Sequence, residues 1–211
     1  LDKFDKSLPY IRNQEKQNIG YEWKNTNLTR VTFVAHGPNQ INGPNIWLQR
    51  LLPELVKHGF EPHVIFMMNS DKNCTVKENL INQGINCTSI QKKQYTEQDI
   101  LQILQVIKFN PPDVFIPHLN VPAYFSTKWL NQSEIPIIGV VHSDDNFYHD
   151  IIDYFGTSSS EYRVSTLVCV SDYLKRSVEY NSSDPVKIYE IPCGVEIPTN
   201  TASYTKELKI V

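Results

Sequence analysis

Short apolar segments alternate with amphipathic segments over most of this chain, and that rhythm limits the folds it can adopt. The apolar segments have the length and composition of buried strands, and several end at Gly, Pro or Asn. The segments that we expect to form strands are Val31–Ala35, His63–Met67, Asn86–Ile90, Val114–Ile116, Ile135–Val141, Thr166–Val170 and Lys187–Ile191.

The segments between these strands have helical periodicity. The first begins near Pro44 and carries an apolar stripe of leucines three and four residues apart, from Leu48 to Leu55. Thr96 and Asp99 resemble a capping box at the start of another helix. Other expected helices are Val76–Gln83, Ile100–Ile107, Ala123–Leu130 and Ser171–Tyr180. Because helices between parallel strands cover both faces of a sheet, we predict an α/β fold with a doubly wound, mostly parallel Rossmann-like sheet of six or seven strands.

Three regions differ in character along the chain. Residues 1–29 are polar and lack clean periodicity, so we expect an N-terminal extension or linker. Residues 30–196 contain the strand–helix rhythm and form the predicted domain. Residues 197–211 are expected to be an interdomain linker and the start of a second, truncated domain, whose first strand would be Leu208–Val211.

Composition excludes several classes of protein. The chain has 211 residues, 40% hydrophobic residues, a net charge of −3 and a pI of about 6.1, so a nucleic-acid partner is not expected. The apolar runs are the length of strands, and the N-terminus has no apolar signal core. The four cysteines lack the spacing of a metal site, so we expect reduced thiols, no metal and a cytoplasmic protein.

The first strand is followed by a loop rich in Gly and Asn. In open parallel sheets, ligands bind outside the carboxyl ends of the strands. Gly37, Asn42, Gly43 and Asn45 lie in this loop or just after it. Glycine lets the backbone approach a ligand, and a helix N-terminus favours anions, so the loop could hold a phosphate or a sugar. A tight strand-to-helix turn is the other interpretation.

Polar residues also follow the later strands. His142 comes after the fifth strand and is followed by Asp144, so it could transfer a proton or bind a polar substrate. A buried histidine that bonds only to backbone is the alternative. A metal site built from His149 with Asp145 or Asp153 is a further interpretation, which no other motif supports.

Three more strand ends carry candidate binding residues: His118, Ser171 and Gly194. His118 resembles His142 in position but follows Pro117. Ser171 is also well placed to cap the helix that follows it, with Asp172 favouring the helix dipole.

The motifs at these positions occur in a familiar order. They are the loop Gly37–Asn45, His58-Gly59-Phe60-Glu61-Pro62-His63-Val64, Pro112-Asp113-Val114-Phe115-Ile116-Pro117-His118, Val140-Val141-His142, Val170-Ser171-Asp172-Tyr173-Leu174 and Ile191-Pro192-Cys193-Gly194-Val195-Glu196. This order resembles the N-terminal half of the group 1, or family 4, retaining glycosyltransferases, over about residues 30–211.

The resemblance implies a GT-B fold, in which two Rossmann-like domains face each other across a cleft. This chain would be the acceptor-binding half, and the C-terminal domain of the same protein would hold a nucleotide-diphosphate sugar. The loop at Gly43 would approach the donor diphosphate, and His142 would contact the transferred sugar. The reaction would proceed with retention, without a metal or cofactor. No two Glu residues stand eight positions apart, so the family's donor signature would lie beyond Val211.

The resemblance also implies a glycan or lipid-linked acceptor, and it leaves peripheral membrane association of the full enzyme open. It implies that the fragment alone is inactive. One alternative is a non-catalytic Rossmann module that binds a glycan or lipid acceptor. Another is a nucleotide-dependent epimerase or dehydrogenase, which the missing GxGxxG fingerprint disfavours.

Overall fold

A computed structural model describes residues 28–36, 43–69 and 74–194. The expectations for the N-terminal extension, for Gly37 and Asn42, and for residues 197–211 lie outside these described residues.

Within the described residues, seven strands form one parallel layer. They are β1 (Thr29–His36), β2 (Phe60–Met68), β3 (Asn86–Gln91), β4 (Val114–Ile116), β5 (Ile138–Val141), β6 (Thr166–Cys169) and β7 (Lys187–Glu190). Four pair in the order β3-β2-β1-β4 and three in the order β5-β6-β7, and every pairing is parallel. A parallel bridge between Phe115 and Ile137 joins the two parts. The predicted parallel, Rossmann-like sheet is confirmed.

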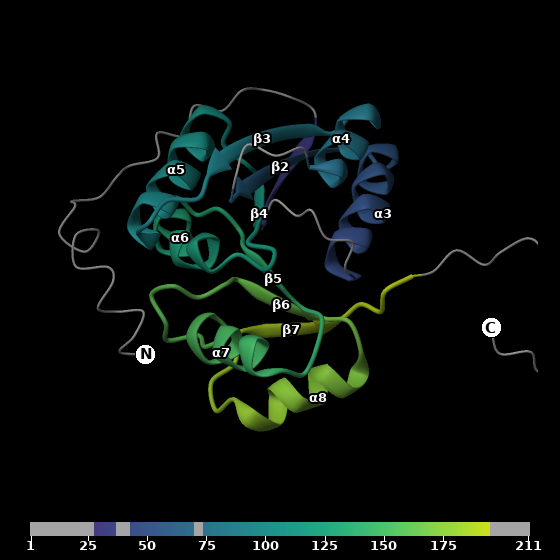
Figure 1. The fold of residues 1–211 in the computed structure, drawn as a ribbon. Coiled ribbons are helices and arrows are strands. Elements are labelled where there is room, and N and C mark those ends of the chain that lie inside the picture. Colours follow the sequence, from purple (N-terminus) through teal and green to yellow (C-terminus); the bar gives the residue numbers. More distant parts are fainter. Residues whose placement is uncertain (1–27, 37–42, 70–73, 195–211) are drawn as a thin grey trace, which may run out of the picture.

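Six described helices connect the strands. They are α3 (Gly43–Lys57), α4 (Thr75–Asn82), α5 (Thr96–Phe109), α6 (Val121–Gln132), α7 (Asn146–Phe155) and α8 (Asp172–Asn181). Figure 1 shows α3 and α4 on one side of the four-stranded part and α5 and α6 on the other. The core divides in the same way, because α3 and α4 share one apolar cluster while α5 to α8 contribute to a second. The sheet is therefore doubly wound, with helices on both faces.

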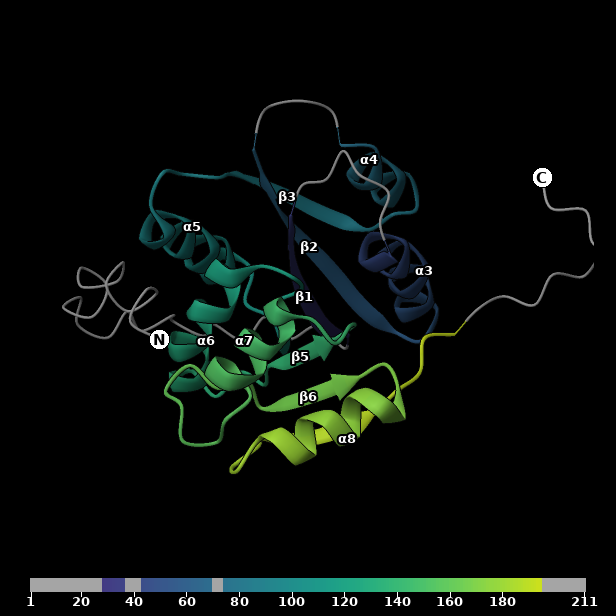
Figure 2. The ribbon, with the colours of Figure 1, turned by 60° about the horizontal axis from the view of Figure 1, so that its bottom comes forward.

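Burial explains why β2 sits near the middle of the four-stranded part. Its side chains from Pro62 to Met68 are all buried, on both faces of the sheet. Such a continuous apolar run suits a central parallel strand covered on both sides. In the other part, β5 and β6 run side by side in the same direction with α8 beside them (Figure 2).

Two details of the sequence interpretation needed correction. The segment after β5 was not among the expected helices, yet it forms α7, with Asp145 as its N-cap. The capping box at Thr96 was wrong, because the N-cap residue is Tyr95 and makes no side-chain cap. The Asp99 carboxylate instead accepts a hydrogen bond from the backbone N–H of Lys93 at 2.8 Å, which fixes the loop before α5.

Candidate functional site

The order of the strands reverses between β1 and β4, and at such a point an open parallel sheet is expected to have a crevice for ligands. From β1 the chain moves outward to β2 and β3, and from β4 it moves the other way to β5, β6 and β7. Helices that leave neighbouring strands for opposite faces open a crevice at the carboxyl edge of the sheet. At this edge α3 follows β1, His118 follows β4 and His142 follows β5. The strand order therefore brings α3 and the two histidines together.

His118, His142 and Trp47 form a compact cluster of rings at this edge. The ring centroids of His118 and His142 lie 5.3 Å apart at 86°. Trp47, on α3, stacks on His118 at 5.2 Å with an interplanar angle of 20°. It meets His142 edge-on at 5.1 Å and 78°. Residues distant in the sequence thus converge on one small volume.

Both histidines are held in the neutral form. Burial lowers the pKa of His118 to about 3, and the neighbouring His142 makes a smaller contribution in the same direction. Burial lowers the pKa of His142 to about 4. Among the described residues, neither ring nitrogen of His118 nor Nε2 of His142 has a hydrogen-bond partner. A neutral imidazole carries one donor and one acceptor, so these rings suit hydroxyl groups better than anions.

The backbone is strained next to His118. Leu119 has a φ of 52°, in the left-handed region that costs a residue with a side chain on the order of 1 kcal/mol. Asn120 follows and is fully buried. Its side chain caps α6 by accepting from the Ala123 N–H at 3.0 Å. The cap of α6 therefore secures the turn that presents His118.

Helix α3 borders the crevice from the other side. Gly43 is its first residue, and Trp47 lies one turn further on. Asn45 is buried within the same turn. The structure thus places the helix that begins at Gly43 against both histidines, whereas Gly37 and Asn42 lie outside the described residues.

Asp144 lies in an exposed hydrogen-bonded chain beside the histidine cluster. One of its carboxylate oxygens lies 2.6 Å from Nε2 of His149, and the other accepts from the Tyr173 hydroxyl at 2.7 Å. The bond to His149, then that to Tyr173, lowers the pKa of the Asp144 carboxyl. Because Tyr173 belongs to α8, these hydrogen bonds of Asp144 connect the loop before α7 to the start of α8.

Ser171 and Gly194 have different structural positions. The Ser171 hydroxyl accepts from the Leu174 N–H at 3.3 Å, so it is the N-cap of α8. Gly194 is exposed beyond the end of β7, and a Cβ there would contact nothing within 4 Å. Neither residue contributes a described contact to the histidine cluster.

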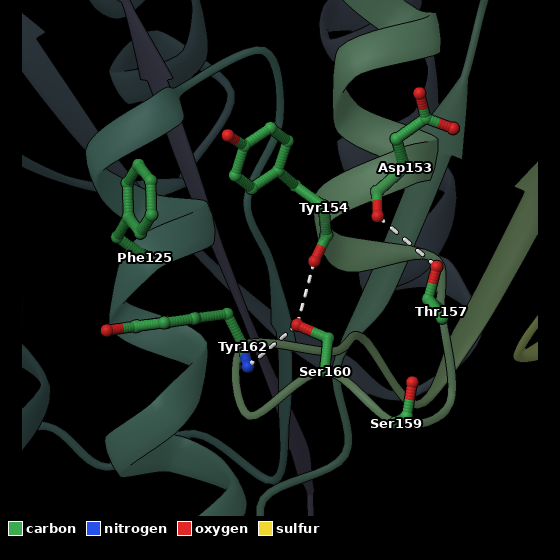
Figure 3. Close-up of a pocket in the computed structure, with 7 residues that line it drawn as sticks. All are labelled: Phe125, Asp153, Tyr154, Thr157, Ser159, Ser160 and Tyr162. Atoms are coloured by element: carbon green, nitrogen blue, oxygen red, sulfur yellow. Dashed lines mark hydrogen bonds between the residues drawn. The ribbon is translucent and has the colours of Figure 1, made fainter. Parts of the chain in front are cut away.

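A separate pocket of about 230 Å³ lies near the C-terminal end of α7 (Figure 3). Since α7 begins at the carboxyl edge and runs back along the sheet, this pocket lies toward the opposite edge. Its Ser160 hydroxyl donates to the Tyr154 carbonyl at 2.8 Å, and Thr157 donates to the Asp153 carbonyl at 3.2 Å. These hydroxyls stabilise the turn after α7, so we do not assign the pocket to catalysis.

Two further properties bear on the alternatives. Within the described ranges, no group of three His, Cys, Asp or Glu side chains could hold a metal ion, and His149 pairs with Asp144 rather than with Asp145 or Asp153. In the same ranges no helix is both long and apolar enough to cross a bilayer. The four cysteines are free thiols.

Sequence reasoning gave no role to Trp47 or to Tyr173, although Tyr173 lies in one of the quoted motifs. The strand-end rule selects residues that directly follow strands, whereas Trp47 lies inside a helix and Tyr173 in the first turn of another. Only the strand order brings the helix bearing Trp47 beside β4 and β5.

Solved structures with a similar fold include the following three proteins. The lipopolysaccharide outer core galactosyltransferase WaaB, in its apo form, aligns with a TM-score of 0.61 and 14% identity, over 81% of this chain and 47% of that chain. Anabaena Alr3699/HepE in complex with UDP aligns with a TM-score of 0.56 and 10% identity, over 80% of this chain and 45% of that chain. The UDP-GlcNAc 2-epimerase of Neisseria meningitidis bound to UDP-GlcNAc aligns with a TM-score of 0.51 and 15% identity, over 76% of this chain and 45% of that chain.

These likenesses, at such low identities, establish the fold. The chain spans less than half the length of each of these structures. No curated protein sequence matches the chain. The parallel sheet and the crevice at its carboxyl edge define a Rossmann-like α/β domain of the kind found in GT-B glycosyltransferases.

The family model for Glycosyltransferase Family 4 matches residues 41–197. The chain belongs to Glycosyltransferase Family 4. The resemblance to the N-terminal domain of a GT-B glycosyltransferase, first indicated by the order of the motifs, is thereby confirmed.

Proposed function

We propose that this chain is the acceptor-side half of an enzyme that transfers a hexosyl group from a nucleotide-diphosphate sugar to a glycan or lipid-linked acceptor, with retention of configuration. Family membership supports glycosyl transfer. The complex of Anabaena Alr3699/HepE with UDP, a protein of similar fold, supports a nucleotide-linked donor. The second domain of the same protein would supply most of the nucleotide site, and the full enzyme would work in the cytoplasm.

One observation carries this proposal: two histidines held neutral by burial face each other next to the start of a helix. Burial of His118 and His142 keeps both rings uncharged near neutral pH. Both His118 nitrogens and Nε2 of His142 are covered in this structure. Once a substrate uncovers them, they would exchange hydrogen bonds with sugar hydroxyls, which are also both donors and acceptors. The N-terminus of α3 offers backbone N–H groups and a positive dipole end to a diphosphate. A sugar and the phosphate it leaves could therefore be held side by side.

The residues have distinct proposed roles. His142 contacts the transferred sugar, and His118 holds it from the neighbouring strand end. Gly43 and Asn45, with the preceding loop, approach the diphosphate. Asp144, exposed and negatively charged, meets the acceptor. No metal or cofactor takes part, and the charge that develops on the leaving diphosphate is met by cationic side chains of the second domain.

The test uses the full-length protein with a panel of uridine, guanosine and thymidine diphosphate sugars, and follows release of nucleoside diphosphate. We expect His142→Ala to lower kcat by about a hundredfold, the size typical of a lost positioned group, while the far-UV circular dichroism stays unchanged. His58→Ala is the matched control, because His58 is exposed just after α3 and away from the cluster.

Equal turnover in the wild-type protein and His142→Ala would remove the role of His142. A wild-type protein that binds an acceptor glycan yet releases no nucleotide from any donor would instead support a non-catalytic binding module.

A further inference from the structure

Trp47 touches both histidines of the cluster, and nothing in the motifs assigns it a role. It stacks on His118 and meets His142 edge-on, with both centroids about as close as the two histidines are to each other. A further aromatic neighbour is Phe33 on β1, with the ring centroids 6.4 Å apart and the planes at 67°. The indole is thus wedged between the end of the sheet and the two imidazoles.

We infer that Trp47 is a positioning residue whose indole holds the His118 and His142 rings in the orientation that the sugar subsite requires. Its catalytic consequence rests on the proposed function. A histidine ring is usually oriented by a hydrogen bond to one of its nitrogens. The Pro44 backbone, on the same helix as Trp47, acts on the His118 ring, but among the described residues neither ring nitrogen has a partner in good hydrogen-bond geometry. Stacking on Trp47 is therefore the contact that does most to fix the plane of the His118 ring.

Packing of the core alone does not account for Trp47. The residues of α3 that carry the core are Leu48 and Leu52, which are fully buried. Trp47 is only half-buried and lies next to the crevice, on the side of α3 that faces the histidines. Trp47 therefore packs at the edge of the core cluster and, in addition, contacts both histidine rings.

The position of Trp47 also links two parts of the proposed donor site. It lies four residues after Gly43, which is about one helical turn. The N-terminus of α3 and the histidine rings are therefore held by one rigid segment. A diphosphate at the helix start and a sugar at the rings would be aligned by the same element, as positioning in catalysis requires.

The first measurement needs no substrate. In the full-length protein labelled at histidine, two-dimensional NMR follows the imidazole signals of His118 and His142 as the pH falls. Trp47→Leu keeps an apolar side chain but removes the ring, and Trp47→Phe keeps a ring. We expect both histidines to titrate closer to ordinary histidine in Trp47→Leu, because water enters, and to stay near the wild-type pattern in Trp47→Phe.

The second measurement is kinetic, with UDP-glucose as the first donor probe. We expect Trp47→Leu to lower kcat about tenfold to a hundredfold, with KM changed by less than about threefold, since misplacement affects the transition state most. Trp47→Phe should recover kcat to within about threefold of wild type. Trp47→Met, whose longer, unbranched side chain adapts better to an irregular gap, replaces the leucine variant if that one does not fold.

Trp129→Leu is the matched control, because Trp129 is a buried indole on α6, away from the crevice. It should lower thermal stability while leaving the histidine signals and kcat unchanged. The inference is overturned if Trp47→Leu keeps wild-type histidine titrations and kcat, or if Trp129→Leu impairs kcat equally. If the wild-type protein transfers sugar from no donor, the proposed function fails, whereas the NMR comparison still decides the positioning role.

Discussion

At the scale of single residues, the site depends on where the polar side chains are buried. His118 is 3% exposed and His142 only partly exposed, so desolvation disfavours their charged forms. The rule that ligands bind beyond strand ends was enough to select both residues from the sequence. It could not select Trp47, because the leucine stripe of α3 defines a core face and says nothing of what the neighbouring face meets.

This burial predicts that acid destabilises the fold. In the unfolded chain each histidine titrates near pH 6.5, whereas the pKa of folded His118 is about 3 and that of folded His142 about 4. As the pH falls from about 6.5 to about 4, the unfolded state binds protons that the folded state does not, so stability is lost by up to about 1.4 kcal/mol per pH unit for each histidine.

Urea denaturation of the wild-type protein and His118→Asn over this pH range measures the effect. The variant should lose stability less steeply on acidification, because asparagine does not titrate. The pKa values of His36 and His63 are also lowered by burial, so the comparison between the two proteins, rather than the wild-type slope alone, isolates His118. Identical slopes would show that His118 is not held neutral by the fold.

At the scale of elements, helix ends explain both a success and an error of the sequence interpretation. Ser171 was expected as a cap, and the structure confirms it. The apparent capping box at Thr96 was wrong because Asp99 turns back to the loop N–H of Lys93. Helix α7 was missed as an element because its apolar residues, such as Tyr148 and Ile152, follow a cluster of polar residues that reads as a loop. Local patterns do not reveal which N–H group a carboxylate will find.

Ser171→Ala should destabilise the protein by about 1 kcal/mol, since it removes the oxygen that accepts from Leu174 N–H. Ser171→Asp keeps a capping oxygen and should restore most of that loss. Urea denaturation measures the stability, and nucleotide release measures the activity in parallel. If Ser171→Ala reduces turnover but not stability, the hydroxyl meets substrate and the cap is secondary.

At the scale of the whole molecule, the rhythm of strands and helices was sufficient to predict a parallel sheet. The strand order was not predictable in the same way, because it depends on which crossover reverses direction. That reversal, between β3 and β4, is what places His118 and Trp47 in one crevice. The motif order predicted the family, which the match over residues 41–197 confirms.

The isolated chain is expected to bind donors weakly. In the proposed enzyme the second domain would hold most of the donor nucleotide, and catalysis would require both domains closed around the substrates. Backbone N–H groups at the start of α3 contribute only about 1 kcal/mol each in an open half-site. We therefore predict that residues 1–211 show no transfer and bind UDP-glucose no better than about millimolar. Isothermal titration measures this, and micromolar affinity would place the donor site in this domain.

The fate of the sugar tests the central claim most directly. The full-length protein is incubated with an α-linked nucleotide sugar, such as UDP-glucose, and an acceptor glycan, and the anomeric proton is followed by NMR. We predict that nucleoside diphosphate is released in step with a new acceptor-linked sugar whose anomeric signal has the α coupling of the donor. Conversion of the nucleotide sugar to its C2 epimer, with no sugar joined to the acceptor, would contradict the account.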